Sequence, residues 1–127
     1  MTLPPRSSPI TVLLVEDNIA IRTLQRYVLT RAGLTVVECA DLPDAKNYLR
    51  TQTPEVVVLD LNLPGGHGLN LLPQINRRRT AVLVMTAMCQ QHTLNASEDL
   101  RDDFMTKPFA PDTFVLRVQN LARQRQA

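Results

Sequence analysis

One stretch of the sequence, residues 56–66 (VVVLDLNLPGG), limits the fold more than any other. Three valines and a leucine lead into a single carboxylate, Asp60, and turn-forming residues follow it. A short apolar run that is rich in β-branched residues is typical of a strand buried on both faces, which requires a parallel sheet covered by helices. We therefore expect Asp60 at the carboxyl end of a central strand, where an open parallel sheet has its ligand crevice.

The composition excludes several classes of protein. The chain has 127 residues, enough for one domain, and its formal net charge of +2 is too small to argue for a nucleic-acid or membrane surface. Cys39 and Cys89 stand far apart and outside any Cys-x-x-Cys pattern, so neither zinc nor a disulfide framework is indicated. No apolar run approaches the roughly 20 residues of a membrane span, and the N-terminus lacks a signal-peptide core. We expect a soluble cytoplasmic protein.

The remaining sequence repeats a strand followed by a helix. Buried strands are expected at 10–15, 34–39, 81–85 and 102–106, in addition to 56–60. Helices are expected from Asn18 to a C-cap at Gly33, after an N-cap at Asp41, over 68–79, within the weakly periodic 88–101, and from Pro111 onward. Pro73 removes a backbone donor from 68–79, so that helix is expected to kink or to start late.

This alternation predicts an α/β fold. Five strands alternating with five helices form a three-layer sandwich around a mainly parallel five-stranded sheet. Residues 10–127 are expected to make one domain. Residues 1–9 contain three prolines and two serines and are expected to be a disordered tail.

Polar side chains stand where the predicted strands end. They are Glu16, Asp17, Asp60, Thr86 and Lys107. Because the carboxyl ends of parallel strands share one edge of the sheet, these residues are expected in one crevice. Three carboxylates together repel one another unless a cation is present, and all-oxygen ligands suit Mg²⁺. The lysine and the threonine hydroxyl then supply a charge and a donor for phosphoryl oxygens.

The sequence resembles the receiver domain of bacterial two-component response regulators. The matching motifs are VLLVEDN at 12–18, VVVLDLNLPG at 56–65, VLVMTA at 82–87 and DDFMTKPF at 102–109, in the order typical of that family. The resemblance implies a flavodoxin-like (βα)5 fold with strand order 2-1-3-4-5. It also implies a phosphorylation-dependent signalling switch rather than a turnover enzyme: the domain catalyses its own phosphorylation and dephosphorylation.

The resemblance assigns a role to each residue of the crevice. Asp60 is implied to be the phospho-acceptor, which takes its phosphoryl group from a sensor histidine kinase or a phosphotransfer protein. The implied ligands of Mg²⁺, the one expected cofactor, are Glu16, Asp17, Asp60 and the backbone carbonyl of Asn62. Lys107 is implied to pair with Asp60 and then with the phosphoryl group, to which the Thr86 hydroxyl also bonds. Phe104 is implied to follow Thr86 from an outward to an inward rotamer.

This movement is implied to change an output face made by the helix within 88–101, the strand 102–106 and the last helix. Arg117, with Asp102 or Asp103, resembles the charges that some DNA-binding members use to form a homodimer across this face. Basic partners for such a dimer are missing from 88–101, so monomer and dimer both stay open. The arginine-rich end resembles a linker, which favours the excised N-terminal domain of a transcriptional regulator over a stand-alone one. Nucleic acid would be bound only through an effector domain beyond residue 127.

The sequence departs from the family pattern after Asp60 and after Thr86. Gly66 and His67 replace the more usual Met-Asp, and we interpret His67 as an exposed loop histidine. Leu100 and Arg101 stand where the family commonly has Gly-Ala. Met88, two residues past Thr86, is bulky and apolar at a position that tunes access of water in the family, so we expect slow dephosphorylation.

Two other classes of protein fit the pattern less well. A haloacid-dehalogenase-like phosphatase also uses an aspartyl phosphate with Mg²⁺, threonine and lysine. Its nucleophile, however, ends the first strand and is followed two residues on by an acid, whereas Asp60 ends the third and is followed by Asn62. A nucleotide-binding module is disfavoured because no glycine-rich phosphate loop follows any predicted strand.

Overall fold

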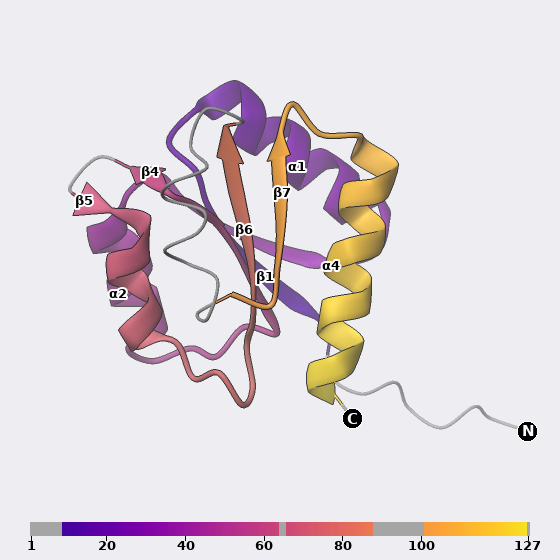
Figure 1. Ribbon diagram of the computed structural model, residues 1–127. Helices are drawn as coiled ribbons and strands as arrows, with labels where there is room; N and C mark the ends of the chain where they lie inside the picture. Colours follow the sequence, from indigo (N-terminus) through magenta and orange to yellow (C-terminus); the bar gives the residue numbers. More distant parts are fainter. Residues whose placement is uncertain (1–8, 64–65, 88–100, 127) are drawn as a thin grey trace, which may run out of the picture.

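The computed structural model describes residues 9–63, 66–87 and 101–126. Five parallel strands form the central sheet in the order β2-β1-β3-β6-β7 (Figure 1). They are β1 (Thr11–Val15), β2 (Thr35–Cys39), β3 (Val56–Asp60), β6 (Ala81–Ala87) and β7 (Asp103–Lys107). Counted along the chain this is the order 2-1-3-4-5, so the predicted flavodoxin-like topology is confirmed. A two-stranded antiparallel pair, β4 (Asn62–Leu63) with β5 (Gly66–His67), follows β3.

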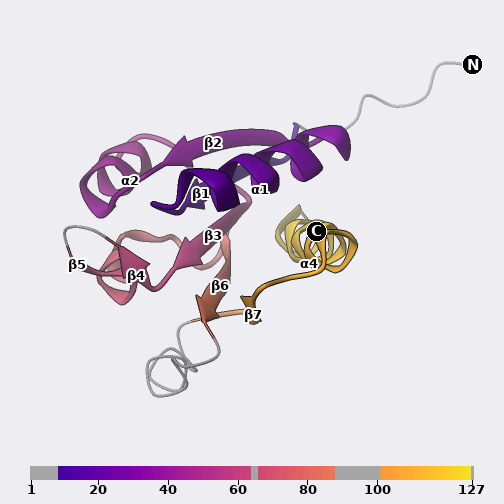
Figure 2. The ribbon, with the colours of Figure 1, turned by 90° about the horizontal axis from the view of Figure 1, so that it is seen from above.

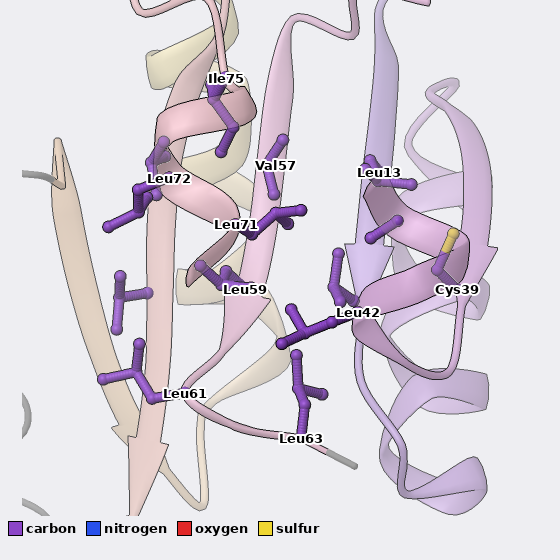
Figure 3. Packing of buried hydrophobic residues seen from close by; sticks show 14 residues of the cluster. Leu13, Cys39, Leu42, Val57, Leu59, Leu61, Leu63, Leu71, Leu72 and Ile75 are labelled. Carbon is purple, nitrogen blue, oxygen red and sulfur yellow. The ribbon is translucent and has the colours of Figure 1, made fainter. Parts of the chain in front are cut away.

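Helices cover both faces of the sheet, which makes three layers (Figure 2). α1 (Ile19–Arg31) and α4 (Pro111–Gln126) pack on one face, where Leu29 and Phe114 are fully buried. α2 (Leu42–Leu49) and the 3₁₀ helix η1 (Gly68–Gln74) pack on the other, and Figure 3 shows their Leu42 and Leu71 in one cluster with Leu59 of β3. None of the helices in the described ranges is long and apolar enough to cross a membrane.

The sequence predicts two of the residues that end the first two helices: the N-cap Asp41, and Gly33, which lies one residue past the C-cap Ala32. The side chain of Asn18 accepts a hydrogen bond from the Ile21 amide at 3.0 Å, and that of Asp41 accepts one from the Asp44 amide at 2.9 Å. Gly33 adopts a φ of 90° just beyond α1, a conformation that a side chain disfavours and glycine does not. These caps satisfy backbone groups that the first and last helical turns leave unpaired.

The predicted helix over 68–79 was wrong in type and in length. Instead of an α-helix that kinks or starts late, a 3₁₀ helix begins at Gly68 and ends at Gln74, with Pro73 inside it. Proline cannot donate the hydrogen bond that would extend an α-helix through this point, and its ring clashes with the preceding turn. The short helix still buries Leu71 and Leu72 against the sheet, and a turn at 76–80 leads into β6.

Two predicted segments lie outside the described residues. They are the helix within 88–101, except for its last residue, and the tail at 1–9, except for Pro9. Met88 and Leu100, on which the expected departures from the family pattern partly depend, belong to the first of these segments.

Candidate functional site

The carboxyl ends of four strands bring most of the predicted site residues to one edge of the sheet. β1 ends next to Glu16, β3 ends on Asp60, and β7 ends on Lys107. Thr86 is the next-to-last residue of β6. The register aligns Asp60 with Met85 of β6, and Ala87 of β6 with Lys107. Lys107 therefore stands two strands from Asp60 and two residues further toward the carboxyl edge, because the residue of β7 at the level of Asp60 is Met105. The long lysine side chain covers this separation.

Lys107 joins two carboxylates. Its Nζ lies 2.6 Å from Oε1 of Glu16 and 3.2 Å from Oδ2 of Asp60. Glu16 is 2% exposed and Asp60 is 6% exposed, whereas the Lys107 side chain is 18% exposed. The second oxygen of Glu16 accepts a hydrogen bond from the Asn18 amide at 3.1 Å. The charged groups of Glu16, Asp60 and Lys107 are thus largely shielded from solvent, and each is paired with a group of opposite charge.

Burial changes the proton affinities of Glu16 and Lys107. It is the main cause that raises the pKa of Glu16 to about 7; the Asp60 charge acts in the same direction, and the bond from Lys107 opposes both. Burial lowers the pKa of Lys107, but its bonds to Glu16 and Asp60 outweigh burial and leave that pKa above its ordinary value. One ammonium therefore does not fully offset two buried carboxylates, and a further cation would stabilise the site.

The chemistry of the acidic side chains fits a hard cation. One oxygen from each of Glu16, Asp17 and Asp60 can be chosen so that all three lie within 4.8 Å of one another. Asp17 is exposed while the other two are buried, so the cluster opens to solvent on one side. Oxygen ligands with water access suit Mg²⁺, which keeps several of its waters. Asn62, the fourth predicted ligand, lies two residues past Asp60 at the start of β4.

The two predicted switch residues lie in neighbouring strands. Thr86 is 2% exposed, and its hydroxyl donates to the carbonyl oxygen of Ala87 at 3.3 Å. Phe104 is 37% exposed on β7, and the Arg101 guanidinium carbon lies 4.5 Å from the centre of its ring. The register pairs Thr86 with Thr106 and Phe104 with Val84. Thr86 is thus buried in β6, whereas Phe104 is exposed on β7.

Gly68 is a site residue that the sequence analysis missed. Its amide donates to the Leu61 carbonyl at 2.8 Å. A Cβ at this position would lie 2.8 Å from Cα of Leu61 and would overlap the carbonyl oxygen of Asp60. Only glycine can pack this closely against the residue that ends β3, and nothing in the sequence apart from the glycine itself signals that contact.

His67 is not the exposed loop histidine that we expected. It is half-buried, and its Nδ1 accepts a hydrogen bond from the Leu69 amide at 3.1 Å, so it caps η1. Histidine is outside the usual set of N-cap residues, which explains why the pattern did not show this. Arg22 was also missed: its Nη1 donates to the backbone carbonyl of Glu16 at 2.8 Å.

Together, the fold and the site define a class of protein: a doubly wound α/β domain with three carboxylates and a lysine at the carboxyl edge of its sheet. The family model of the response regulator receiver domain matches residues 12–119. The chain belongs to this family, the receiver domains of two-component systems.

Curated relatives agree with this assignment. PhoB of Escherichia coli (strain K12), a phosphate regulon transcriptional regulatory protein, is 33% identical over 118 residues, which cover 89% of this chain and 52% of PhoB. SphR of Synechococcus elongatus, an alkaline phosphatase synthesis transcriptional regulatory protein, is 34% identical over 137 residues, covering 98% of this chain and 53% of SphR. The chain thus spans about half the length of the curated relatives it matches.

Two solved structures show the shared fold. The signal receiver domain of an HD domain-containing protein from Pseudomonas fluorescens Pf-5 has a TM-score of 0.89 at 16% identity, covering 99% of this chain and 96% of that one. A CheY-like receiver domain protein from Methanospirillum hungatei JF-1 has a TM-score of 0.86 at 19% identity, covering 94% of this chain and 98% of that one.

Proposed function

We propose that the chain is a phosphorylation-dependent signalling switch in which Asp60 accepts a phosphoryl group. The observation that carries this proposal is the buried Asp60 carboxylate at the end of β3, 3.2 Å from the Lys107 ammonium and clustered with Glu16 and Asp17. The proposed donor is a phosphohistidine on a sensor histidine kinase or a phosphotransfer protein. Because such a donor is made with ATP, the proposal places the reaction in the cytoplasm.

The proposed reaction needs few protein groups. An oxygen of Asp60 attacks the phosphorus atom, and an O–P bond forms as the P–N bond to the donor imidazole breaks. The imidazole leaves with the electron pair and takes up a proton. Lys107 can stabilise the negative charge on the transferred oxygens from its observed position beside Asp60. Glu16, Asp17, Asp60 and the backbone carbonyl of Asn62 would hold Mg²⁺, which supplies positive charge to the phosphoryl oxygens when bound.

The proposed response begins at Thr86. Its hydroxyl would exchange the Ala87 carbonyl for a phosphoryl oxygen, and Phe104 would turn inward from its exposed position. An inward Phe104 would give up its contact with Arg101 and would reshape the surface formed by β7 and α4. A buried side chain and an exposed one that both have alternative positions are the kind of element that couples a local charge to a distant surface.

The output is proposed to be transcriptional. PhoB and SphR carry transcriptional regulatory names and are about twice as long as the part that this chain covers, which favours an effector domain in the full-length protein. A groove of about 250 Å³ on the proposed output face is lined by Phe104, Pro108, Phe109 and Arg117. Arg117 pairs with Asp103 of its own chain at 3.2 Å, so a homodimer across this face would have to share or break that pair.

Phosphorylation by a small donor tests the proposal. The wild type and Asp60→Asn are incubated with acetyl phosphate, with Mg²⁺ or with EDTA, and their intact masses are compared. We expect the wild type to gain one phosphoryl group only with Mg²⁺, and Asp60→Asn to gain none. A wild type that stays unmodified would overturn the proposal, and sustained release of phosphate from phosphomonoesters would favour the phosphatase alternative.

A further inference from the structure

The Arg22 side chain on α1 joins the acidic loop after β1 to the neighbouring strand β2. Its Nη1 donates to the backbone carbonyl of Glu16 at 2.8 Å, and its Nε donates to Oε1 of Glu38 at 3.1 Å. The side chain is 16% exposed, so both bonds are partly shielded from water. The guanidinium offers these donors in one rigid plane, which fixes the two acceptors relative to each other.

Glu38 is itself held from two sides. Its Oε2 lies 3.3 Å from Nε of Arg26, one helical turn beyond Arg22 on α1. Glu38 is thus placed between two arginines of one helix. The Arg26 side chain is 50% exposed, and among the described residues it pairs with Glu38 and not with the acidic cluster. Arg22 and Arg26 share a partner, and Arg22 alone also contacts the loop.

The carbonyl that Arg22 holds belongs to the peptide unit between Glu16 and Asp17. Because that unit is planar, fixing its oxygen restricts where the Cα of Asp17 can lie. The Glu16 amide, on the other side of the same residue, donates to the Cys39 carbonyl at 3.1 Å. Within the described part of the chain, the structure gives the Asp17 carboxylate no hydrogen bond of its own. Its placement therefore depends on the backbone to which it is attached.

We propose that Arg22 is a positioning residue for the proposed metal site: it holds the Glu16–Asp17 peptide so that both carboxylates point into the cluster with Asp60. The inference rests on the proposed function, since it concerns the affinity of the same site for Mg²⁺. The donors of Arg22 go to the Glu16 carbonyl and to the Glu38 carboxylate. Arg22 acts through the backbone, as groups that orient metal ligands commonly do.

Charge and geometry can be separated at this position. The Arg22 charge is offset by Glu38, so geometry should dominate its effect on the cluster. Arg22→Lys keeps the charge but cannot present the two donors of a planar fork. Arg22→Gln removes the charge as well. Arg26→Gln is the matched control, because it removes the other arginine from Glu38 without touching the Glu16 carbonyl.

The experiment measures the Mg²⁺ dissociation constant of the whole chain by calorimetry, and the urea midpoint, for the wild type and the three variants. Arg22→Lys and Arg22→Gln are expected to raise the dissociation constant by about 10-fold, the usual size of an outer-shell effect. Arg26→Gln should leave it unchanged. At saturating Mg²⁺, both Arg22 variants should regain the wild-type rate of phosphorylation by acetyl phosphate, because Asp60, Thr86 and Lys107 are untouched.

The outcomes separate this inference from the function on which it rests. If the wild type binds Mg²⁺ and both Arg22 variants bind it equally tightly, the positioning role is overturned and the proposed function stands. Equal losses of Mg²⁺ affinity in Arg22→Lys and Arg26→Gln would also overturn the positioning role. The loss would then follow from changing either arginine of α1, and not from the bond to the Glu16 carbonyl. A wild type that binds no Mg²⁺ would overturn both. If Arg22→Gln does not fold, Arg22→Lys alone decides.

Discussion

Lys107, on the edge strand β7, lies closer to Glu16 than to Asp60: its Nζ is 2.6 Å from Oε1 of Glu16 and 3.2 Å from Oδ2 of Asp60. Lys107→Met removes the ammonium that these two buried carboxylates share. Breaking a buried ion pair from one side is expected to lower the free energy of unfolding by about 3 kcal/mol at pH 8. Urea unfolding measured without divalent cations checks this value.

The same variant also tests the metal site. If Mg²⁺ binds among Glu16, Asp17 and Asp60, it should restore more stability to Lys107→Met than to the wild type, because the variant has lost the competing ammonium. Adding Asp17→Asn to the variant should remove that gain. Equal stabilisation of the wild type and Lys107→Met by Mg²⁺ would contradict the shared use of these carboxylates.

The site was predictable where it depends on side chains at strand ends, and not where it depends on backbone contacts. Continuous apolar runs mark β1, β3 and β6, and parallel strands end at one edge of the sheet, so the sequence places Asp60 and Lys107 near each other. Arg22 and Gly68 act on carbonyl oxygens, which every residue carries, and no pattern distinguishes them. Pro73 indicated that the helix over 68–79 would be disturbed. Because a short α-helix and a short 3₁₀ helix can both contain a residue without a backbone donor, the sequence did not determine which helix type forms.

Gly68 offers a test of backbone packing beneath Asp60. Gly68→Ala would place a methyl group against the Asp60 carbonyl and 2.8 Å from Cα of Leu61, and neither backbone can yield without moving the end of β3. We expect a loss of about 3 kcal/mol in the free energy of unfolding, at the upper end for overpacking. Phosphorylation by acetyl phosphate should slow in the same variant.

Gly33→Ala provides the comparison. No atom lies within 4 Å of a Cβ at Gly33, so the cost there comes only from the left-handed φ of 90° and should be about 1 kcal/mol. Phosphorylation should be unaffected. Equal effects of the two substitutions on phosphorylation would show that Gly68 does not position Asp60.

Gln25 is fully buried on α1, and neither its Oε1 nor its Nε2 has a hydrogen-bond partner among the described residues. Leaving such an amide unpaired in the core costs free energy that an apolar side chain of the same size does not incur. Gln25→Met is therefore expected to stabilise the fold by about 1 kcal/mol or more in urea unfolding. Gln25→Glu, which puts a charge in the same place, should destabilise it; a stabilising Glu would disprove the apolar environment.

Cys39 ends β2 and is 7% exposed. Burial, helped by the negative charges of Asp44 and Asp41, raises the pKa of this thiol to about 11. Because the thiolate is the reactive form, Cys39 should be alkylated very slowly at pH 7 in the folded protein, and the rate should keep rising with pH well past the ordinary thiol range. Iodoacetamide labelling of Cys89→Ser, followed by mass spectrometry, isolates this thiol. Labelling at the rate of a free thiol without urea would mean that β2 opens readily at its carboxyl end, and this would remove the support that the Cys39 carbonyl gives to the Glu16 amide.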